Sequence, residues 1–177
     1  MFPPLTLEGD HVRLEPLSLG HVAGLTAASS GQRETFAYTW VQGGRVVGST
    51  RFFNFEYLRW PEGTRSPGEP PDAVEIGWTW LAPDAQRTAL NTEAKLLMLT
   101  HAFESWKVVR VNLRTDALNA RSRAAIERLG AKLDGILRAH VPSARGGIRD
   151  TATYSLLMQE WPEVKDRLVR RLQGLEP

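Results

Sequence analysis

The sequence predicts one domain of the α/β (α+β) class, built on a mixed, mostly antiparallel sheet of about six to seven strands that is flanked by helices. Two observations lead to this class. Runs rich in β-branched and aromatic residues alternate along the chain with stretches in which apolar residues recur every three or four positions. No internal repeat, low-complexity tract or linker interrupts the 177 residues, so residues 1–177 are expected to form a single domain.

A strand and then a short helix are expected first. Val12 and Leu14 alternate with charged neighbours, which predicts a half-buried strand over residues 11–17. Ser18 then offers a helix cap, and the apolar pattern predicts a short helix over residues 19–28.

A hairpin and a loop are expected next. Two β-rich runs, residues 35–41 and 45–55, flank the turn Gln42-Gly43-Gly44, so they are expected to pair as adjacent antiparallel strands. Residues 59–72 are rich in proline and glycine and are expected to form a loop that adds nothing to the core.

A strand that runs through a short loop into a helix is expected at the centre of the chain. Residues 75–83 are rich in β-branched and aromatic residues, and Pro83 stops this strand. From Ala89 onward the pattern predicts a helix of about four turns. Its inward face comprises Leu90, Ala94, Leu97, Met98 and His101. Because the first-turn N–H groups of a helix lack backbone acceptors and lie at the positive end of its dipole, this corner can hold a pyrophosphate.

The rest of the chain is expected to add three strands and two helices. Residues 108–115 alternate between apolar and polar types, which predicts a strand with one polar face. Asn119 is expected to cap a helix for which Gly130 supplies the left-handed exit. The remaining elements are strands at residues 133–141 and 151–158 and a final helix that begins at Pro162.

Composition excludes several classes of site and partner. The chain has no cysteine, which excludes disulfides, zinc-thiolate sites and thiol nucleophiles. A net charge of +2 is too small to indicate a nucleic-acid or membrane partner, and no run is long and apolar enough for a signal peptide or a membrane span. We therefore expect a cytoplasmic protein. The four histidines lack metal-ligand spacing, so no metal site is predicted: His11, His21, His101 and His140. His101 continues an apolar helix face and is expected in the core.

Three short motifs lie in the second half of the chain: Gln86 to Asn91, then Asn119-Ala120-Arg121-Ser122, then Leu129-Gly130-Ala131. Together they resemble the Gln/Arg-x-x-Gly-x-Gly/Ala, Asn-x-x-Ser and Leu-Gly-Phe/Ala motifs of the GNAT superfamily of acetyl-CoA-dependent N-acetyltransferases. Residues 91–97 and 150–161 are similar to its Rim-type branch, the ribosomal-protein N-terminal acetyltransferases. The resemblance spans roughly residues 7–172.

The resemblance implies a sheet that is splayed at its centre, between its fourth and fifth strands, to admit acetyl-CoA (coenzyme A). The residues expected to bind this cofactor are Trp80, Leu81, Gln86, Arg87, Thr88, Ala89, Leu90, Asn91, Thr92, Asn119 and Ser122. Ala89 and Asn91 depart from the family signature, which has glycine at the first of these positions and glycine or alanine at the second. The methyl group of Ala89 is expected to restrict the backbone angles and the approach of the diphosphate.

The chemistry of acyl transfer assigns further roles. The edge at Trp80-Leu81 is expected to aim a backbone amide at the thioester oxygen, while the side chains of Trp78 and Trp80 are expected in the core. Glu75 lies eleven residues before Gln86, as the base glutamate does in histone-acetylating relatives. An exposed charge at the end of the strand is the alternative interpretation of Glu75.

The resemblance implies that Ser122 assists the coenzyme A thiolate and that Asn119 bonds the pantetheine arm. The alternative for Asn119 is a simple helix cap, and the two roles are compatible. Tyr154 is a second candidate for the acid, ranked below Ser122.

The expected reaction is direct attack by a primary amine, either a protein N-terminal α-amine or a small-molecule amine, on acetyl-CoA. Residues 29–35 leave little room for the acceptor-binding helix of the family, so a second copy in a homodimer or the loop at residues 59–72 is expected to complete the acceptor pocket. A non-catalytic acyl-CoA-binding or regulatory module is the alternative function. A nucleic-acid-binding domain has little support, because the aromatic residues do not interleave with clustered basic ones.

Overall fold

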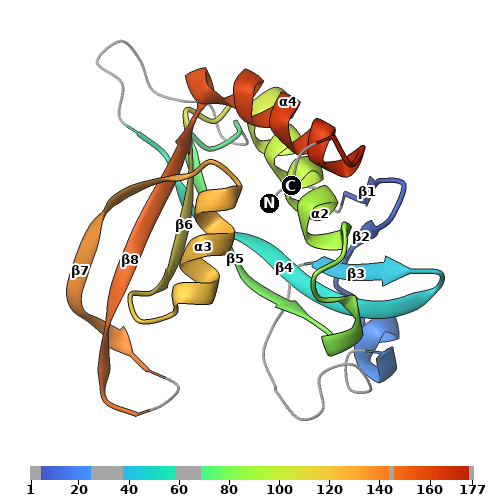
Figure 1. Cartoon of the computed structure of the whole chain (residues 1–177), viewed down its shortest axis with the longest axis horizontal. Coiled ribbons are helices and arrows are strands. Elements are labelled where there is room, and N and C mark those ends of the chain that lie inside the picture. The colour runs from blue at the N-terminus through green and yellow to red at the C-terminus, as the bar shows by residue number, and fades with distance from the viewer. Residues whose placement is uncertain (1–4, 25–37, 59–68, 144–145, 176–177) are drawn as a thin grey trace.

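The computed structural model describes residues 5–24, 38–58, 69–143 and 146–175. These residues form one eight-stranded sheet in the order β1-β2-β3-β4-β5-β6-β8-β7 (Figure 1). The strands are β1 Leu7–Glu8, β2 Arg13–Pro16, β3 Tyr38–Gln42, β4 Arg45–Glu56, β5 Ala73–Leu81, β6 Arg110–Asp116, β7 Lys132–Pro142 and β8 Ile148–Leu157. The short β1 is one strand more than the six to seven predicted, and the predicted class is confirmed.

The helical segments are η1 Leu19–His21, η2 Pro83–Ala85, α2 Leu90–Thr100, η3 His101–Ser105, α3 Ala120–Arg128, η4 Met158–Glu160 and α4 Trp161–Leu172. The segment η3 is one π-helical turn that continues α2, so the predicted four-turn helix is present but changes its winding before it ends. No helix among the described residues is long and apolar enough to cross a membrane.

The sheet divides between β5 and β6. These two strands pair in parallel through only three residue pairs, Ala73 with Arg110, Val74 with Val111 and Glu75 with Asn112. All the other strand pairs described are antiparallel. Beyond Glu75 the strands separate, and Figure 1 shows β5 turning toward β4 while β6 continues beside β8. The predicted splay is therefore present between the predicted fourth and fifth strands.

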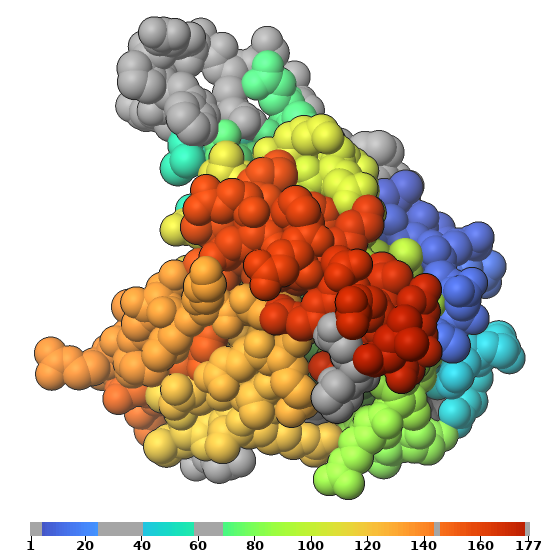
Figure 2. Space-filling view, turned by 45° about the horizontal axis from the view of Figure 1, so that its top comes forward, coloured from blue at the N-terminus to red at the C-terminus, as the bar shows by residue number. Residues whose placement is uncertain are grey.

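The core lies between this sheet and helices α2 and α4. Leu90, Ala94 and Met98 of α2 are buried together with Val74 and Ile76 of β5. Helix α4 covers α2 and crosses the face that Figure 2 shows. The spacing of three and four residues in α2 thus gives the apolar face that the sequence predicts.

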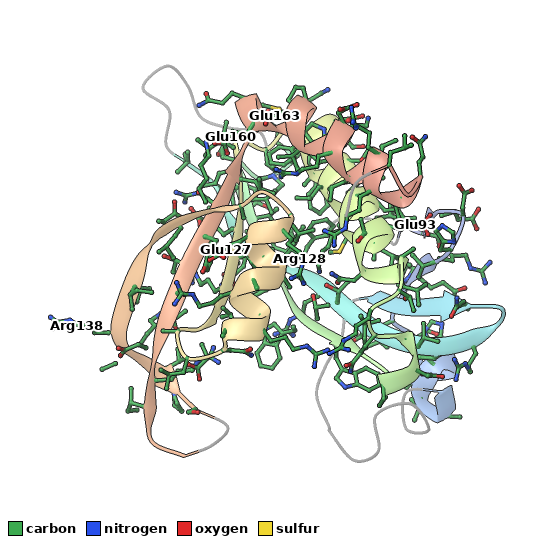
Figure 3. All side chains as sticks on the ribbon, in the orientation of Figure 1. Glu93, Glu127, Arg128, Arg138, Glu160 and Glu163 are labelled. Carbon is green, nitrogen blue, oxygen red and sulfur yellow. The ribbon has the colours of Figure 1, made fainter. Side chains whose placement is uncertain are left out.

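Glu93 fixes α2 to the turn between β1 and β2. Its carboxylate, which is labelled in Figure 3, accepts hydrogen bonds from the backbone N–H groups of Asp10, His11 and Val12 at 2.7 to 2.8 Å. Gly9 allows this approach, because a Cβ atom there would lie 2.5 Å from the Glu93 side chain. The N-terminal strands are thereby tied to the helix that leads out of the splay.

Some expectations differ from the structure or fall outside it. The tail of the helix expected over residues 19–28, the acceptor-side residues 29–35 and most of the loop at residues 59–72 lie outside the described residues. The expectation that this loop adds nothing to the core is wrong at its end: Pro71 and Asp72 are buried, and the Asp72 carboxylate accepts the Leu58 N–H at 2.7 Å.

Candidate active site

Strand β5 carries a bulge just past the division of the sheet. Ser49 of β4 pairs with Trp80 and Arg51 with Gly77, so Trp78 and Thr79 both lie opposite Thr50. Trp78 has a left-handed φ of 51° and is 50% exposed. The Arg51 guanidinium carbon lies 4.4 Å from the centroid of the Trp78 ring. The expectation that Trp78 is a core residue is wrong, because the bulge turns its side chain outward. Trp80, in contrast, packs against the core as expected.

The end of β5 presents an open backbone edge. The Ala82 N–H donates to Val47 of β4 at 2.9 Å. Along an antiparallel strand, the backbone groups of successive residues point alternately toward the paired strand and away from it. Since the Ala82 N–H points toward β4, the Leu81 N–H points to the opposite edge of β5, where β6 no longer pairs. The Leu81 carbonyl on that side accepts the Gln86 side-chain amide at 3.1 Å. A backbone donor of the predicted Trp80-Leu81 edge therefore lies along the opening, and its role toward a thioester stays a prediction.

The loop from β5 to α2 leaves a group of backbone donors unsatisfied. Among the described residues, no hydrogen-bond acceptor meets the backbone N–H groups of Arg87, Thr88, Ala89, Asn91 and Thr92. The N-cap residue of α2 is Ala89, which has no side chain able to cap the helix. These donors lie at the positive end of the α2 dipole. Free N–H groups and a positive dipole end are the features that bind a diphosphate.

Two backbone conformations shape this loop. Arg87 has a left-handed φ of 63°, which is rare for a residue with a side chain. Ala89, however, has φ −62° and ψ −22°, which every L-residue adopts without strain. The expected restriction at Ala89 is thus absent from its backbone angles, since glycine is not required for this conformation.

Helix α3 meets the same opening. The Asn119 side chain accepts the Ser122 N–H at 3.0 Å, so Asn119 is the predicted N-cap. Arg121 donates to the side-chain oxygen of Gln86 at 2.6 Å and so bridges α3 to the loop after β5. This bond joins elements from the two sides of the divided sheet. It brings the Gln86 loop together with the first turn of α3, which carries Ser122.

Glu75 lies at the last residue pair before the strands separate. It is only 3% exposed, so the alternative of an exposed strand-end charge is wrong. Its carboxylate accepts the Asn54 side-chain amide at 2.9 Å, and the Arg114 guanidinium lies 3.5 Å away. The carboxylate is therefore held at the point where the sheet opens, with a fixed orientation.

Tyr154 does not face the opening. It is fully buried on β8, its hydroxyl donates to Glu127 at 2.9 Å, and it accepts from Arg123 at the same distance. The hydrogen bond to Tyr154 raises the pKa of Arg123. Both partners belong to α3, so Tyr154 joins β8 to that helix, and its proton is already engaged. Ser122 is thus the better placed of the two predicted acids.

One charged residue near the opening escaped the sequence analysis. Lys95 of α2 is buried, and its ammonium donates to Thr79 at 2.7 Å and to Thr50 at 3.0 Å. Burial lowers its pKa from 10.5 to about 7. The signal in the sequence was a lysine next to Ala94, on the inward side of an apolar helix.

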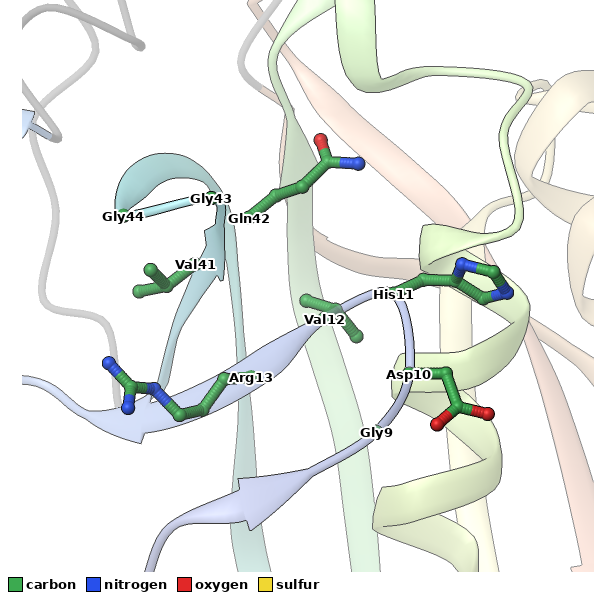
Figure 4. A pocket seen from close by; sticks show the side chains of 9 residues that line it. All are labelled: Gly9, Asp10, His11, Val12, Arg13, Val41, Gln42, Gly43 and Gly44. Atoms are coloured by element: carbon green, nitrogen blue, oxygen red, sulfur yellow. The ribbon is translucent and has the colours of Figure 1, made fainter.

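Other features of the described residues lie elsewhere. No cluster of three metal-ligating side chains is found among them. His101 is partly buried against Trp106, as expected of a core histidine, and burial lowers its pKa. A hollow of about 350 Å³ lies between the β1–β2 turn and the β3–β4 hairpin (Figure 4). It contains none of the predicted site residues.

Comparisons with known proteins agree with this architecture. The sequence model of the family described as "Acetyltransferase (GNAT) domain" matches residues 11–132. The chain is 34% identical over 88 residues to "Putative ribosomal N-acetyltransferase YdaF" of Bacillus subtilis (strain 168), a match that covers 50% of this chain and 47% of that protein. The match thus spans about half the length of this curated relative.

Solved structures share the whole fold. A GCN5-related N-acetyltransferase from Brucella melitensis is 25% identical with a TM-score of 0.82, over 97% of this chain and 86% of that one. RimJ of Mycobacterium smegmatis, solved in complex with CoA-disulfide, is 17% identical with a TM-score of 0.71, over 96% and 93% of the two chains. At that identity, RimJ is similar in fold alone.

Proposed function

We propose a specific reaction for this chain, which belongs to the GNAT family of acetyltransferases: it transfers the acetyl group of acetyl-CoA to a primary amine by direct attack. The observation that carries the proposal is the group of N–H donors without an acceptor among the described residues, next to the open edge of β5: Arg87, Thr88, Ala89, Asn91 and Thr92. Acetyl-CoA supplies a thioester, whose carbon is attacked by the amine nitrogen as the carbon–sulfur bond breaks and the sulfur leaves with a proton.

The cofactor fits the residues of this corner. The N–H groups of residues 87–92 suit the diphosphate, and the Arg87 side chain adds a cation. The open edge at Leu81 and the first turn of α3, with Asn119 and Ser122, flank the path from this corner to the splay. The complex of RimJ with CoA-disulfide supports the choice of coenzyme A.

Three groups of the chain serve the chemistry. The Leu81 N–H stabilises the negative charge that develops on the thioester oxygen. Glu75 accepts a proton from the ammonium of the acceptor, directly or through water, because only the neutral amine that results can attack the thioester carbon. The Ser122 hydroxyl donates a hydrogen bond to the departing sulfur.

The acceptor we favour is the α-amine of a protein N-terminus. The name of the Bacillus relative points to ribosomal proteins as the acceptor class. A small-molecule amine is the other candidate, and a second copy of the chain or residues 59–72 would complete the acceptor pocket. In either case the amine must reach the region of Glu75 to lose its proton there.

An amine panel tests the function. Acetyl-CoA is mixed with hexapeptides that begin with Ala, Ser, Thr or Met and with spermidine, and thiol release is followed over time. Release that depends on one of these amines, with an acetylated product of the expected mass, is the predicted result. Thermal stabilisation by coenzyme A without any release would instead identify an acyl-CoA-binding module.

A further inference from the structure

The ammonium of Lys95 lies directly beneath the bulge of β5. It donates to the hydroxyls of both Thr79, a bulge residue, and Thr50, the β4 residue opposite. The two hydroxyls lie 3.0 Å apart, and Thr50 also donates to the Gly77 carbonyl at 3.3 Å. One buried side chain thereby connects α2 with both strands at the place where their register shifts.

Stability alone does not explain this lysine. Burying an ammonium costs free energy that hydrogen bonds to two hydroxyls only partly offset, and an apolar side chain of similar length would avoid that cost. The neighbouring inward residues of α2, Leu90, Ala94 and Met98, are apolar as expected for a core helix. Two charged residues of α2 depart from this pattern: Glu93, whose carboxylate binds the turn between β1 and β2, and Lys95, whose ammonium binds the two strands at the bulge.

The bulge sets the direction of the backbone that follows it. Trp78 is held at a left-handed φ of 51°, and only after Thr79 does β5 resume its pairing, at Trp80 with Ser49. Which side of the strand the Leu81 N–H faces depends on this extra residue. Without the bulge, the register before it would continue and place Leu81 opposite Val47, which would turn this amide toward β4 and away from the open edge.

We propose that Lys95 is a positioning residue for acyl transfer, which holds the bulge through Thr79 and Thr50 and so keeps the Leu81 N–H aimed along the open edge of β5. The inference rests on the proposed function. Lys95 touches neither thioester nor amine in this arrangement, and its effect passes through the two hydroxyls. Loss of this contact should lower turnover and leave the diphosphate corner unchanged.

Variants at the exposed end of the contact give the cleanest test, because Thr79 lies at the surface and is not one of the buried apolar residues of the core. Thr79→Val removes the hydroxyl at nearly constant shape, and Thr79→Ser retains it. Thr100→Val, at the far end of α2, is the matched control for a threonine-to-valine change. Lys95→Met removes the ammonium itself.

We expect Thr79→Val and Lys95→Met to lower kcat by about tenfold, measured as thiol release with the most reactive amine of the panel. The Kd for coenzyme A should stay within about twofold, and Thr79→Ser and Thr100→Val should resemble the wild type. A Thr79→Val enzyme with unchanged kcat, or a loss seen only in the Kd for coenzyme A, would overturn the inference. If Lys95→Met does not fold, Thr79→Val decides the question alone.

A spectroscopic reading separates this inference from the proposed function. The amide ¹H–¹⁵N signal of Leu81 should shift in Thr79→Val and keep its position in Thr79→Ser. If the wild type binds coenzyme A but releases no thiol with any amine, the proposed function is rejected while the Leu81 signal still reports on the bulge. An unmoved Leu81 signal in Thr79→Val would reject the inference whatever the activity.

Discussion

The Arg114 guanidinium of β6 lies 3.5 Å from the Glu75 carboxylate of β5, across the gap that opens where the two strands stop pairing. Where the strands separate, the Glu75 carboxylate and the Arg114 guanidinium face each other, although β5 and β6 no longer share backbone hydrogen bonds there. Asn54 of β4 donates to the same carboxylate. Three strands therefore fix the orientation of Glu75 at the apex of the splay.

Glu75→Gln should lower kcat/KM about 10²-fold at pH 7, because the glutamine amide cannot take the proton from the ammonium of the acceptor before the neutral amine attacks. The loss should shrink above about pH 8, where an α-amine is increasingly deprotonated without help. The measurement is the pH profile of thiol release, with Glu163→Gln on the exposed face of α4 as the control. A profile parallel to that of the wild type would remove Glu75 from the proton transfer.

Arg87→Ala should weaken coenzyme A binding by about tenfold, because the variant loses the cation beside the diphosphate while the backbone donors remain. Pantetheine, which lacks the diphosphate, serves as the control ligand and should bind both proteins equally. Calorimetry with both ligands makes the comparison. Equal losses for the two ligands would indicate that Arg87 acts on the fold of the loop and not on the diphosphate.

Tyr154→Phe and Ser122→Ala should separate stability from catalysis. Tyr154→Phe should lower the free energy of unfolding by about 1 kcal/mol, because the hydroxyl bonds to Arg123 and Glu127 are lost, and should leave kcat within about twofold. Ser122→Ala should do the reverse and lower kcat about tenfold through the lost bond to the leaving sulfur. Urea titrations and initial rates measure both effects. A large loss of kcat in Tyr154→Phe alone would exchange the two roles.

The buried ammonium of Lys95 should make stability depend on pH. Its pKa is lowered to about 7 in the fold, so between pH 7 and 10.5 the unfolded chain holds a proton that the folded chain has released. The free energy of unfolding should therefore rise with pH across this window, by at most about 1.4 kcal/mol per pH unit, relative to Lys95→Met. Below pH 7 the difference should be constant. Urea unfolding of both proteins at pH 6, 8 and 9 checks this, and a difference that does not change with pH would show that Lys95 keeps its ordinary pKa.

Periodicity predicted most of the fold, because each core element buries one regular face. The spacing in α2 gave Leu90, Ala94 and Met98, and the alternation in β2 gave Val12 and Leu14, all of them buried. Asn119 was predicted as a cap because its side chain satisfies a local backbone donor. These features depend on residues that are close in the sequence.

The features that sequence reasoning missed depend on contacts between distant segments. Trp78 has a large apolar side chain of the kind found in cores, and only the register of β5 against β4 turns it outward. The bonds from Arg121 to Gln86 and from Lys95 to Thr50 join residues more than thirty positions apart. No local pattern encodes such pairs, so the bulge and its buried lysine became visible only in the folded chain.

The crystal structure of the chain with coenzyme A tests the central claim most directly. The predicted result is a diphosphate whose oxygens accept hydrogen bonds from the N–H groups of residues 87–92, with the pantetheine arm along the open edge of β5 at Leu81. A coenzyme A molecule seated elsewhere, for example in the hollow beside Gly43 and Arg13, with those N–H groups still unsatisfied, would contradict it.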